Sequence, residues 1–282
     1  MKEMQNKSCS YCGAGEIHLY TRLSSAVFKG DYSIEICDSC GVALTNPKPK
    51  TNIVHYGEAV RDQNEREVAD FKESSRKVVV TALQLYTNKY FTAPLSLLDI
   101  GCGFGFLAGE ARRLGLHTTG IEPSVSMAEF ASKSGAEIFV GSLFDFNSYE
   151  KYDILHLESV LEHIEDVTGL LTFLREHSKN DSIIIFGQAL YDGLLPKIFR
   201  KFWYGWSPAE HFWHFSESAF SRLLLTNGFE ILQVERTSLI HSFYFGLKLR
   251  SLIFQNSKAL VSLVAAVFKL GDHGYFYVSR LK

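Results

Sequence analysis

A short segment near residue 100 constrains the fold of this chain more than any other part of the sequence. The apolar run from Leu95 to Ile100 leads into the loop Gly101–Gly105, in which every second residue is glycine. Apolar residues at helical spacing follow from Phe106 to Leu114, so the segment predicts a strand, a tight turn and a helix. Glycine permits a positive φ and lets a ligand approach the backbone. The helix N-terminus offers free N–H groups and a partial positive charge, which suit a carboxylate or a phosphate.

Strand-like and helical runs alternate along most of the chain. The later expected strands are His117–Ile121, Glu137–Val140, Tyr152–Leu157, Ser182–Phe186, Phe229–Arg236 and Gly274–Val278, and the later expected helices are Val125–Ser134, Gly169–His177 and Phe220–Thr226. Such alternation predicts an α/β fold with a parallel sheet that helices cover on both faces. With 282 residues, 46% of them hydrophobic, the chain can bury one core of ordinary size and still carry a small module.

The spacing of the glycines separates two kinds of ligand. A dinucleotide-binding loop needs Gly-x-Gly-x-x-Gly, but Phe106 stands where the third glycine would be. The sequence instead has Gly-x-Gly-x-Gly, with Asp99 two residues before the first glycine. This pattern resembles motif I of the class I, Rossmann-like S-adenosylmethionine-dependent methyltransferases. The alternative for the glycines is a tight turn that binds no ligand.

Four further segments resemble that family, in the same order along the chain. They are Gly120-Ile-Glu122-Pro123, Gly141-Ser142-Leu143, Tyr152–Ile164 with its Leu161-Glu-His163 sequence, and Asn227-Gly-Phe229. The resemblance covers about residues 95–236. It implies a doubly wound, mainly parallel seven-stranded sheet, S-adenosylmethionine as the cofactor and methyltransferase activity.

The resemblance also implies which residues hold the cofactor. In the family, an acidic residue at the position of Glu122 accepts hydrogen bonds from both ribose hydroxyls, and the segment at Ser142-Leu143 holds the adenine. The implied cofactor-binding residues are Tyr56, Asp99, Gly101, Cys102, Gly103, Gly105, Glu122, Pro123, Ser142, Leu143 and Glu158. The alternative for Glu122 is a solvated loop carboxylate. Cys102 is interpreted as a small residue that fills space in the loop and not as a nucleophile.

Residues 1–50 carry two close cysteine pairs, separated by 24 residues and each followed by glycine. Four sulfurs at such spacing predict a small zinc ribbon with a closed, tetrahedral and therefore structural Zn²⁺ site, formed by Cys9, Cys12, Cys37 and Cys40. A module of this size lacks a large core, so metal binding would stabilise its fold. The alternatives are a redox pair or idle thiols. The expected organisation is a zinc ribbon at 1–50, a helical linker and cofactor lid at 51–94, and a methyltransferase domain at 95–282.

Similar N-terminal zinc ribbons occur in bacterial methyltransferases near sugar and polysaccharide pathways. The segment His55-Tyr56-Gly57-Glu58 also resembles that subgroup, in which a tyrosine near this point lies over the cofactor. This is the basis for including Tyr56 among the cofactor-binding residues.

Two histidines are candidates for a catalytic base. Methyl transfer is an in-line displacement for which the protein mainly orients the acceptor. A hydroxyl acceptor also needs a base, and histidine suits that role near neutral pH. His163 follows the fourth strand, and His211 lies in an aromatic segment, Trp206–Ser216, that resembles the family's insert over the acceptor site. The alternatives are a histidine that packs its own loop at His163 and a core-packing loop around His211.

The segment 238–270 is apolar with interspersed basic residues, and it predicts a helical insertion. One interpretation is a peripheral membrane contact or a site for a lipid-linked acceptor. We favour the alternative, an insertion that packs over the pocket or forms a dimer contact, because core helices are also apolar.

Composition narrows the choice of function. The formal net charge of −2 provides no basic footprint, so nucleic acid is not an expected partner. The polar N-terminus and the lack of a long apolar run predict no signal peptide and no spanning helix, and the expected location is the cytoplasm. The leading prediction is a methyltransferase that acts on a hydroxyl of a small molecule or glycan, such as a sugar or a lipid-linked saccharide. The alternatives are C-methylation of a nucleotide sugar and a catalytically idle, cofactor-binding scaffold.

Overall fold

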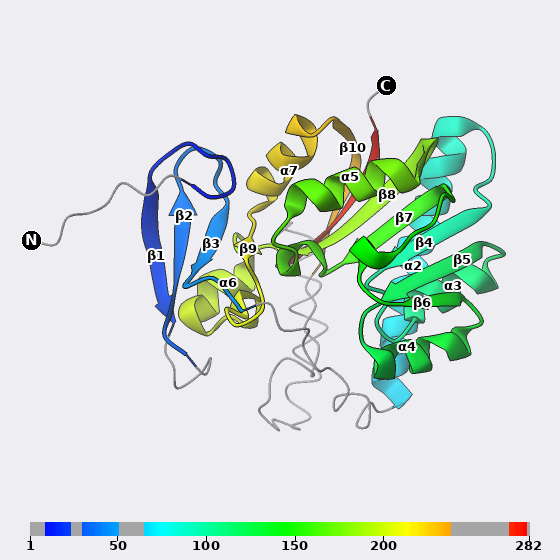
Figure 1. Ribbon diagram of the computed structural model, residues 1–282, viewed down its shortest axis with the longest axis horizontal. Helices are drawn as coiled ribbons and strands as arrows, with labels where there is room; N and C mark the ends of the chain where they lie inside the picture. The colour runs from blue at the N-terminus through cyan, green and yellow to red at the C-terminus, as the bar shows by residue number, and fades with distance from the viewer. Residues whose placement is uncertain (1–8, 24–29, 51–64, 238–270, 281–282) are drawn as a thin grey trace, which may run out of the picture. The chain divides into compact units, whose positions relative to one another are not determined.

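In the computed structural model of the protein, the strand before the glycine loop lies near the middle of a seven-stranded sheet (Figure 1). The sheet order is β10-β11-β8-β7-β4-β5-β6. Its strands are β4 (Ser96–Ile100), β5 (His117–Glu122), β6 (Glu137–Val140), β7 (Tyr152–Glu158), β8 (Ser178–Ala189), β10 (Phe229–Thr237) and β11 (His273–Arg280). Strands β4 to β8 pair in parallel. The predicted α/β fold with a mainly parallel seven-stranded sheet is confirmed.

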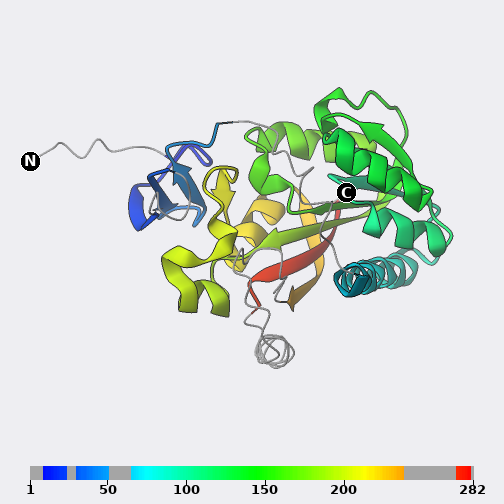
Figure 2. The same cartoon turned by 90° about the horizontal axis from the view of Figure 1, so that it is seen from below.

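Helices cover this sheet. These helices are α2 (Glu65–Tyr90), α3 (Phe106–Arg113), α4 (Val125–Ala131) and α5 (Val167–His177). Helices α6 (Leu194–Phe199) and α7 (Glu217–Thr226) follow later in the chain. Val79 of α2 and Leu107 of α3 share a buried cluster with Leu97 of β4 and Ile154 of β7. Burying each of these side chains contributes about 1.5–3 kcal/mol. Figure 2 shows α2, in cyan, nearly along its axis beside the strands.

A buried carboxylate ties the beginnings of three parallel strands together. Asp153 at the start of β7 accepts hydrogen bonds from the backbone N–H groups of Leu95 and Ser96, at 2.9 and 3.0 Å. Lys179 of β8 donates to the same carboxylate at 2.9 Å. Burial would raise the pKa of Asp153, but Lys179 and the hydrogen bonds outweigh burial and lower it. The charge of Asp153 is therefore paired with that of Lys179. This pair lies at the amino ends of the strands, whereas the glycine loop lies at their carboxyl ends.

Several helices differ in their ends from the sequence expectation, among them α5 and α4, while α7 begins at Glu217 instead of Phe220. Helix α5 begins at Val167 instead of Gly169, because the Asp166 side chain accepts a hydrogen bond from Gly169 N at 2.8 Å and caps the first turn. Helix α4 ends at Ala131, and the expected last turn, Ser132–Ser134, is a separate 3₁₀ helix, η2. Local capping and turn tightening set both ends.

A second sheet has four strands in the order β1-β2-β3-β9. They are β1 (Ile17–Leu23), β2 (Tyr32–Cys37), β3 (Ala43–Asn46) and β9 (Trp213–His214), and each neighbouring pair is antiparallel. Ile34 and Ala43 of this sheet are buried in one cluster with Leu195 of α6 and with Trp203 and Trp206. Strands β2 and β3 therefore share a core with residues 195–206, a much later part of the chain.

The structure describes residues 9–23, 30–50, 65–237 and 271–280. The chain divides into two compact units: residues 1–51, 188–226 and 235–274 form the first, and residues 52–187, 227–234 and 275–282 form the second. Tyr56 and the segment 238–270 lie outside the described residues. No helix among the described residues is long and apolar enough to cross a membrane. The domain boundaries expected from the sequence stay a prediction.

Candidate cofactor site and cysteine cluster

The glycine loop lies at the carboxyl ends of the parallel strands of the second unit. Gly101 N and Cys102 N both donate to the carbonyl oxygen of Ile121, at 2.8 and 3.0 Å, so the loop is fastened to the end of β5. Gly101 and Gly105 adopt φ angles of 68° and 71°. A Cβ atom at Gly101 would lie 2.6 Å from Val160 Cγ2, and one at Gly105 would lie 2.9 Å from the backbone of Ala131. Both positions therefore require glycine for conformation and for space.

Aromatic side chains of the glycine loop and of helices α2, α3 and α4 pack against one another. Phe104 lies edge-on to Phe130 of α4, with ring centroids 5.6 Å apart, and 5.9 Å from Phe106. Phe106 also stacks on Phe71 of α2 at 5.7 Å. Contacts of this kind each contribute about 0.5–1.5 kcal/mol beyond simple burial. Phe106, which in the sequence only excluded a dinucleotide motif, thus helps to hold the loop in one conformation.

Glu122, the last residue of β5, is buried and bonded to the loop. Its Oε2 accepts a hydrogen bond from Gly103 N at 2.9 Å, and its Oε1 accepts one from Ser124 N at 2.8 Å. Burial raises the pKa of Glu122, and the two backbone N–H groups oppose that rise. Each carboxylate oxygen retains acceptor capacity for a ligand hydroxyl. Since only 6% of the residue is exposed, the alternative of a solvated loop carboxylate is wrong.

A second buried carboxylate lies at the end of β4. Asp99 Oδ1 lies 2.7 Å from Nδ1 of His156 in β7, and the two residues are direct neighbours in the strand register. Asp99 Oδ2 is buried and has no hydrogen-bond partner among the described residues. A buried carboxylate oxygen without a donor costs about 1–3 kcal/mol, so this atom fits a ligand donor.

Glu158 and Tyr275 continue this network. Nε2 of His156 lies 3.8 Å from Glu158 Oε2, and the Tyr275 hydroxyl of β11 donates to Glu158 Oε1 at 2.7 Å. Burial raises the pKa of Glu158, whereas the charge of His156 and the Tyr275 hydrogen bond lower it. The sequence analysis singled out Glu158 but missed His156 and Tyr275. The available signal was a histidine among the apolar residues Ile154, Leu155 and Leu157 of the expected strand.

Cys102 behaves as a space-filling residue. Its thiol is buried, and burial, followed by the charges of Asp99 and Glu122, raises its pKa far above the ordinary value. A Cβ atom at Gly120 would lie 2.7 Å from Cys102 Sγ, so the sulfur occupies the space that Gly120 leaves open. A neutral, enclosed thiol is a poor nucleophile.

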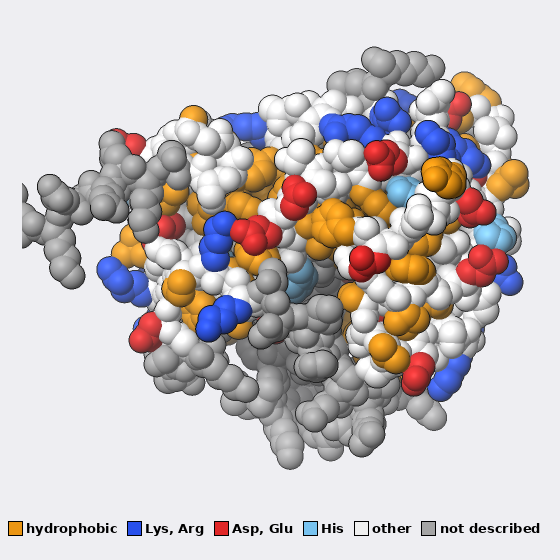
Figure 3. All heavy atoms as spheres, in the orientation of Figure 1, with side chains coloured by type: hydrophobic (Ala, Val, Ile, Leu, Met, Phe, Trp, Pro, Cys, Tyr) orange, Lys and Arg blue, Asp and Glu red, His pale blue; other side chains and the backbone are white. Residues whose placement is uncertain are grey.

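The segment after β6 lies beside Glu122. Gly141 N donates to the Glu122 carbonyl oxygen at 3.1 Å, and Ser142 Oγ accepts from Phe144 N at 3.2 Å and so caps the turn η3 (Leu143–Asp145). Leu143 is buried, whereas Val140 and Phe144 are about half exposed. On the face that Figure 3 shows, apolar side chains reach the surface between acidic and basic ones. Exposed apolar side chains beside a buried carboxylate are suited to a flat base joined to a sugar.

A family profile described as "Methyltransferase domain" matches residues 63–234, which include the glycine loop, Glu122 and Glu158. The chain belongs to this methyltransferase family. The predicted class, a class I S-adenosylmethionine-dependent methyltransferase, is thus confirmed at the level of family and, as the solved structures below show, of fold.

Curated relatives match part of the methyltransferase. This chain is 30% identical over 97 residues to the ubiquinone biosynthesis O-methyltransferase of Rickettsia canadensis. The match covers 32% of this chain and 41% of the relative. The chain is 35% identical over 81 residues to the protein of the same name from Nitrobacter winogradskyi, covering 27% and 31% of the two chains. The chain therefore spans less than half the length of these relatives.

Solved structures share the fold. The plantazolicin methyltransferase BpumL in complex with SAH has a TM-score of 0.52 at 18% identity, and the match covers 81% of this chain and 95% of that one. Magnesium protoporphyrin IX methyltransferase (ChlM) from Synechocystis PCC 6803 with bound SAH has a TM-score of 0.51 at 18% identity, with coverage of 78% and 89%. These similarities show the fold alone.

The two predicted catalytic histidines of the methyltransferase belong to different units. His163 is half-buried in the second unit and ends the 3₁₀ turn η4 (Leu161–His163), which directly follows the carboxyl end of β7. His211 belongs to the first unit, where its Nδ1 lies 3.1 Å from the Gly205 carbonyl oxygen. The structure therefore does not test a shared catalytic role.

His214, which lies in the same aromatic segment as His211, is a structural residue. Its Nε2 lies 2.9 Å from Thr45 Oγ1, and the Thr45 hydroxyl donates to the His211 carbonyl oxygen at 2.7 Å. Burial lowers the pKa of His214 to about 3, so its imidazole is neutral and a weak base near neutral pH.

The four paired cysteines come together in the first unit. Cys9 Sγ and Cys40 Sγ are 3.9 Å apart, Cys12 Sγ and Cys37 Sγ are 3.8 Å apart, and all four sulfurs lie within 4.8 Å of one another. Sulfurs bound to one tetrahedral zinc at about 2.3 Å would be separated by about 3.8 Å. None of the four forms a disulfide. The donor set and its spacing are therefore compatible with a structural Zn²⁺.

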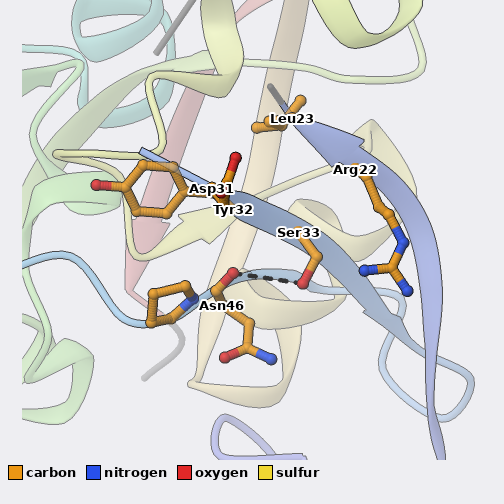
Figure 4. A pocket seen from close by; sticks show the side chains of 7 residues that line it. Arg22, Leu23, Asp31, Tyr32, Ser33 and Asn46 are labelled. Atoms are coloured by element: carbon orange, nitrogen blue, oxygen red, sulfur yellow. Dashed lines mark hydrogen bonds between the residues drawn. The ribbon is translucent and has the colours of Figure 1, made fainter. Parts of the chain in front are cut away.

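A surface hollow of about 460 Å³ lies on the four-stranded sheet (Figure 4). It is lined by Arg22, Leu23, Asp31, Tyr32, Ser33, Asn46 and Pro47. Ser33 donates to the Asn46 carbonyl oxygen at 3.3 Å across it. Residues 24–29 beside it are not described, so we assign the hollow no ligand.

Proposed function

We propose that this protein transfers the methyl group of S-adenosylmethionine to a hydroxyl of a small molecule or glycan, such as a sugar or a lipid-linked saccharide. One observation carries the proposal. Two buried carboxylates, Asp99 and Glu122, end adjacent parallel strands on either side of the loop Gly101–Gly105, and Asp99 keeps one buried oxygen without a partner among the described residues. A zwitterionic amino acid joined to a ribose has the groups that such a site requires.

Each part of the cofactor has a partner in this site. We assign the ribose hydroxyls to Glu122, the ammonium group to Asp99 Oδ2, and the carboxylate to the N–H groups of the loop Gly101–Gly105 at the start of α3. The adenine is assigned to Pro123, Ser142 and Leu143. Cys102 shapes the loop, Glu158 supports Asp99, and Tyr56, outside the described residues, is assigned to cover the cofactor.

The chemistry follows from the cofactor and the acceptor. When bound, S-adenosylmethionine supplies an electrophilic methyl group, so the protein mainly orients the acceptor and excludes water. An oxygen acceptor must also lose a proton. We assign that proton to His163, which lies beyond the carboxyl end of β7, and keep His211 as the second candidate. The curated relatives are named O-methyltransferases, which supports oxygen as the acceptor atom.

We also propose that Cys9, Cys12, Cys37 and Cys40 hold one structural Zn²⁺ in a ribbon at residues 1–50. Zinc ribbons in methyltransferases near sugar pathways support a saccharide acceptor. Cysteine ligands kept reduced suit the cytoplasm. With this ribbon we propose a linker and cofactor lid at residues 51–94 and a methyltransferase domain at residues 95–282. We also propose an insertion at residues 238–270 that packs within the protein. The alternative for this insertion is a peripheral membrane contact.

Two experiments test the proposal. Calorimetry with the full chain should detect S-adenosylmethionine and its demethylated product but not NAD; binding of NAD alone would overturn the cofactor assignment. Incubation with methyl-labelled cofactor and fractionated bacterial extract should then label a small-molecule or glycan fraction at oxygen. Label on carbon would favour a C-methyltransferase of nucleotide sugars, and cofactor binding without transfer to any fraction would favour a scaffold.

A further inference from the structure

His156 lies between two carboxylates in the second unit. Its Nδ1 is 2.7 Å from Asp99 Oδ1 on β4, and its Nε2 is 3.8 Å from Glu158 Oε2 at the end of its own strand. The histidine is almost completely buried, at 3% exposure of its side chain. Because a carboxylate oxygen only accepts, Nδ1 must carry the hydrogen, and Nε2 faces a second acceptor.

The surroundings of His156 favour its charged form. Asp99 faces it from β4 and Glu158 from β7, while its neighbour in register on β8 is the apolar Ile185. Glu122 and the Cys102 thiol lie near Asp99, where burial and then the charge of Asp99 raise the pKa of each. Burial alone would lower the pKa of the ring. The charge and hydrogen bond of Asp99, followed by the charge of Glu158, outweigh burial and raise it.

His156 supplies a cation beside several carboxylates. Besides burial, the charge of Asp99 raises the pKa of both Glu122 and Glu158, so these acidic side chains interact unfavourably at the strand ends. An imidazolium between Asp99 and Glu158 balances one of these charges and restrains both side chains. The tyrosine hydroxyl of Tyr275 restrains the far side of Glu158.

We propose that His156 is a positioning residue of the cofactor site: its imidazolium bridges Asp99 and Glu158 and fixes the Asp99 carboxylate so that Oδ2 faces the ammonium group of the cofactor. The inference rests on the proposed cofactor site and adds a residue that the family pattern did not indicate. His156 acts through Asp99 and does not contact the reacting atoms.

Removal of the imidazolium should couple cofactor binding to protons. His156 lowers the pKa of Glu158, so a neutral residue at position 156 lets that pKa rise further. Protonation of Glu158 then competes more strongly with binding of the positively charged cofactor, so binding releases protons. Affinity of such a variant therefore falls more steeply than the wild-type affinity as the pH is lowered.

The test compares His156→Asn, which keeps a hydrogen-bond donor without the charge, with His156→Leu. Calorimetry with S-adenosylmethionine, in two buffers of different ionisation heat, gives the affinity and the protons released. We expect both variants to bind about 10- to 150-fold more weakly at pH 6.5, the range for a hydrogen bond to a charged group, and to release protons on binding. His177→Asn is the matched control, because His177 is also buried in the second unit but bonds only a backbone carbonyl.

The outcomes separate this inference from the proposed function. If Asp99→Asn leaves the affinity unchanged, the cofactor-site assignment itself is wrong. If Asp99→Asn weakens binding but His156→Asn changes neither affinity nor proton release, only the role of His156 is overturned. An equal loss at every pH without proton release would mean that His156 merely packs.

A readout on the wild-type protein needs no variant. Nitrogen-15 NMR of histidine-labelled full chain should show both ring nitrogens of His156 protonated at pH 7, where an ordinary histidine is about three-quarters neutral. A neutral ring at that pH would overturn the proposal.

Discussion

The sharpest test of the cofactor site is the conservative change Glu122→Gln. In the wild type, one carboxylate oxygen accepts a hydrogen bond from Gly103 N at 2.9 Å, and the other accepts one from Ser124 N at 2.8 Å. Glutamine keeps one acceptor and places an amide NH₂ against the second backbone N–H. The variant therefore loses one acceptor for the loop and one for a ribose hydroxyl.

The size of the effect differs for binding and for folding. A hydrogen bond to a charged group contributes about 1.5–3 kcal/mol, so loss of one ribose contact should raise the Kd about 10- to 150-fold. Folding changes less. Burial raises the pKa of Glu122, which means that folding disfavours its charge, and removal of that charge offsets part of the lost hydrogen bond. We expect the free energy of unfolding to change by about 1 kcal/mol or less.

Calorimetry with S-adenosylhomocysteine measures the Kd, and chemical denaturation measures stability in the same preparation. Glu129→Gln is the control, because Glu129 is exposed on α4 and makes the same change of charge in the same unit. Glu122→Ala, which removes both acceptors, should weaken binding further. Wild-type affinity in both Glu122 variants would refute the site, and an equal fall in affinity and stability would refute the separation of the two effects.

Three further predictions concern the metal, the base and the loop. Metal analysis should find about one zinc per chain, and chelation should lower the thermal stability; a folded protein without zinc would contradict the ribbon. His163→Asn should lower kcat about 10²- to 10⁴-fold once an acceptor is known, with little change in cofactor Kd, whereas an unchanged kcat would exclude His163 as the base. Phe104→Ala should reduce the free energy of unfolding by about 1–3 kcal/mol through loss of its contacts with Phe106 and Phe130. The control Phe91→Ala, at a ring that is 91% exposed, should have little effect, and equal losses in both variants would contradict the packing argument.

Much of the fold could be predicted because it depends on local pattern. Alternating runs of strand and helix determined the α/β class, and the glycines at positions 101, 103 and 105 determined the tight turn before α3. The same holds for Glu122, the last residue of β5, and for the cysteine pairs, because the spacing within each pair is local. The ends of α4 and α5 were less predictable, because a 3₁₀ turn ends α4 and a single side-chain cap sets the start of α5.

Strand register and long-range packing decided the rest. Asp99 and His156 are 57 residues apart in the chain, and only the parallel register of β4 and β7 makes them direct neighbours. Likewise, only the folded chain adds β9 to the cysteine-bearing sheet. Sequence spacing reports which residues share a turn of one helix or a face of one strand. It does not report which strands pair or in what register, because that depends on the burial of side chains from the whole chain. The sequence by itself thus determined the cofactor loop and the cysteine pairs, and the tertiary structure alone brought His156 beside the loop's buried carboxylate.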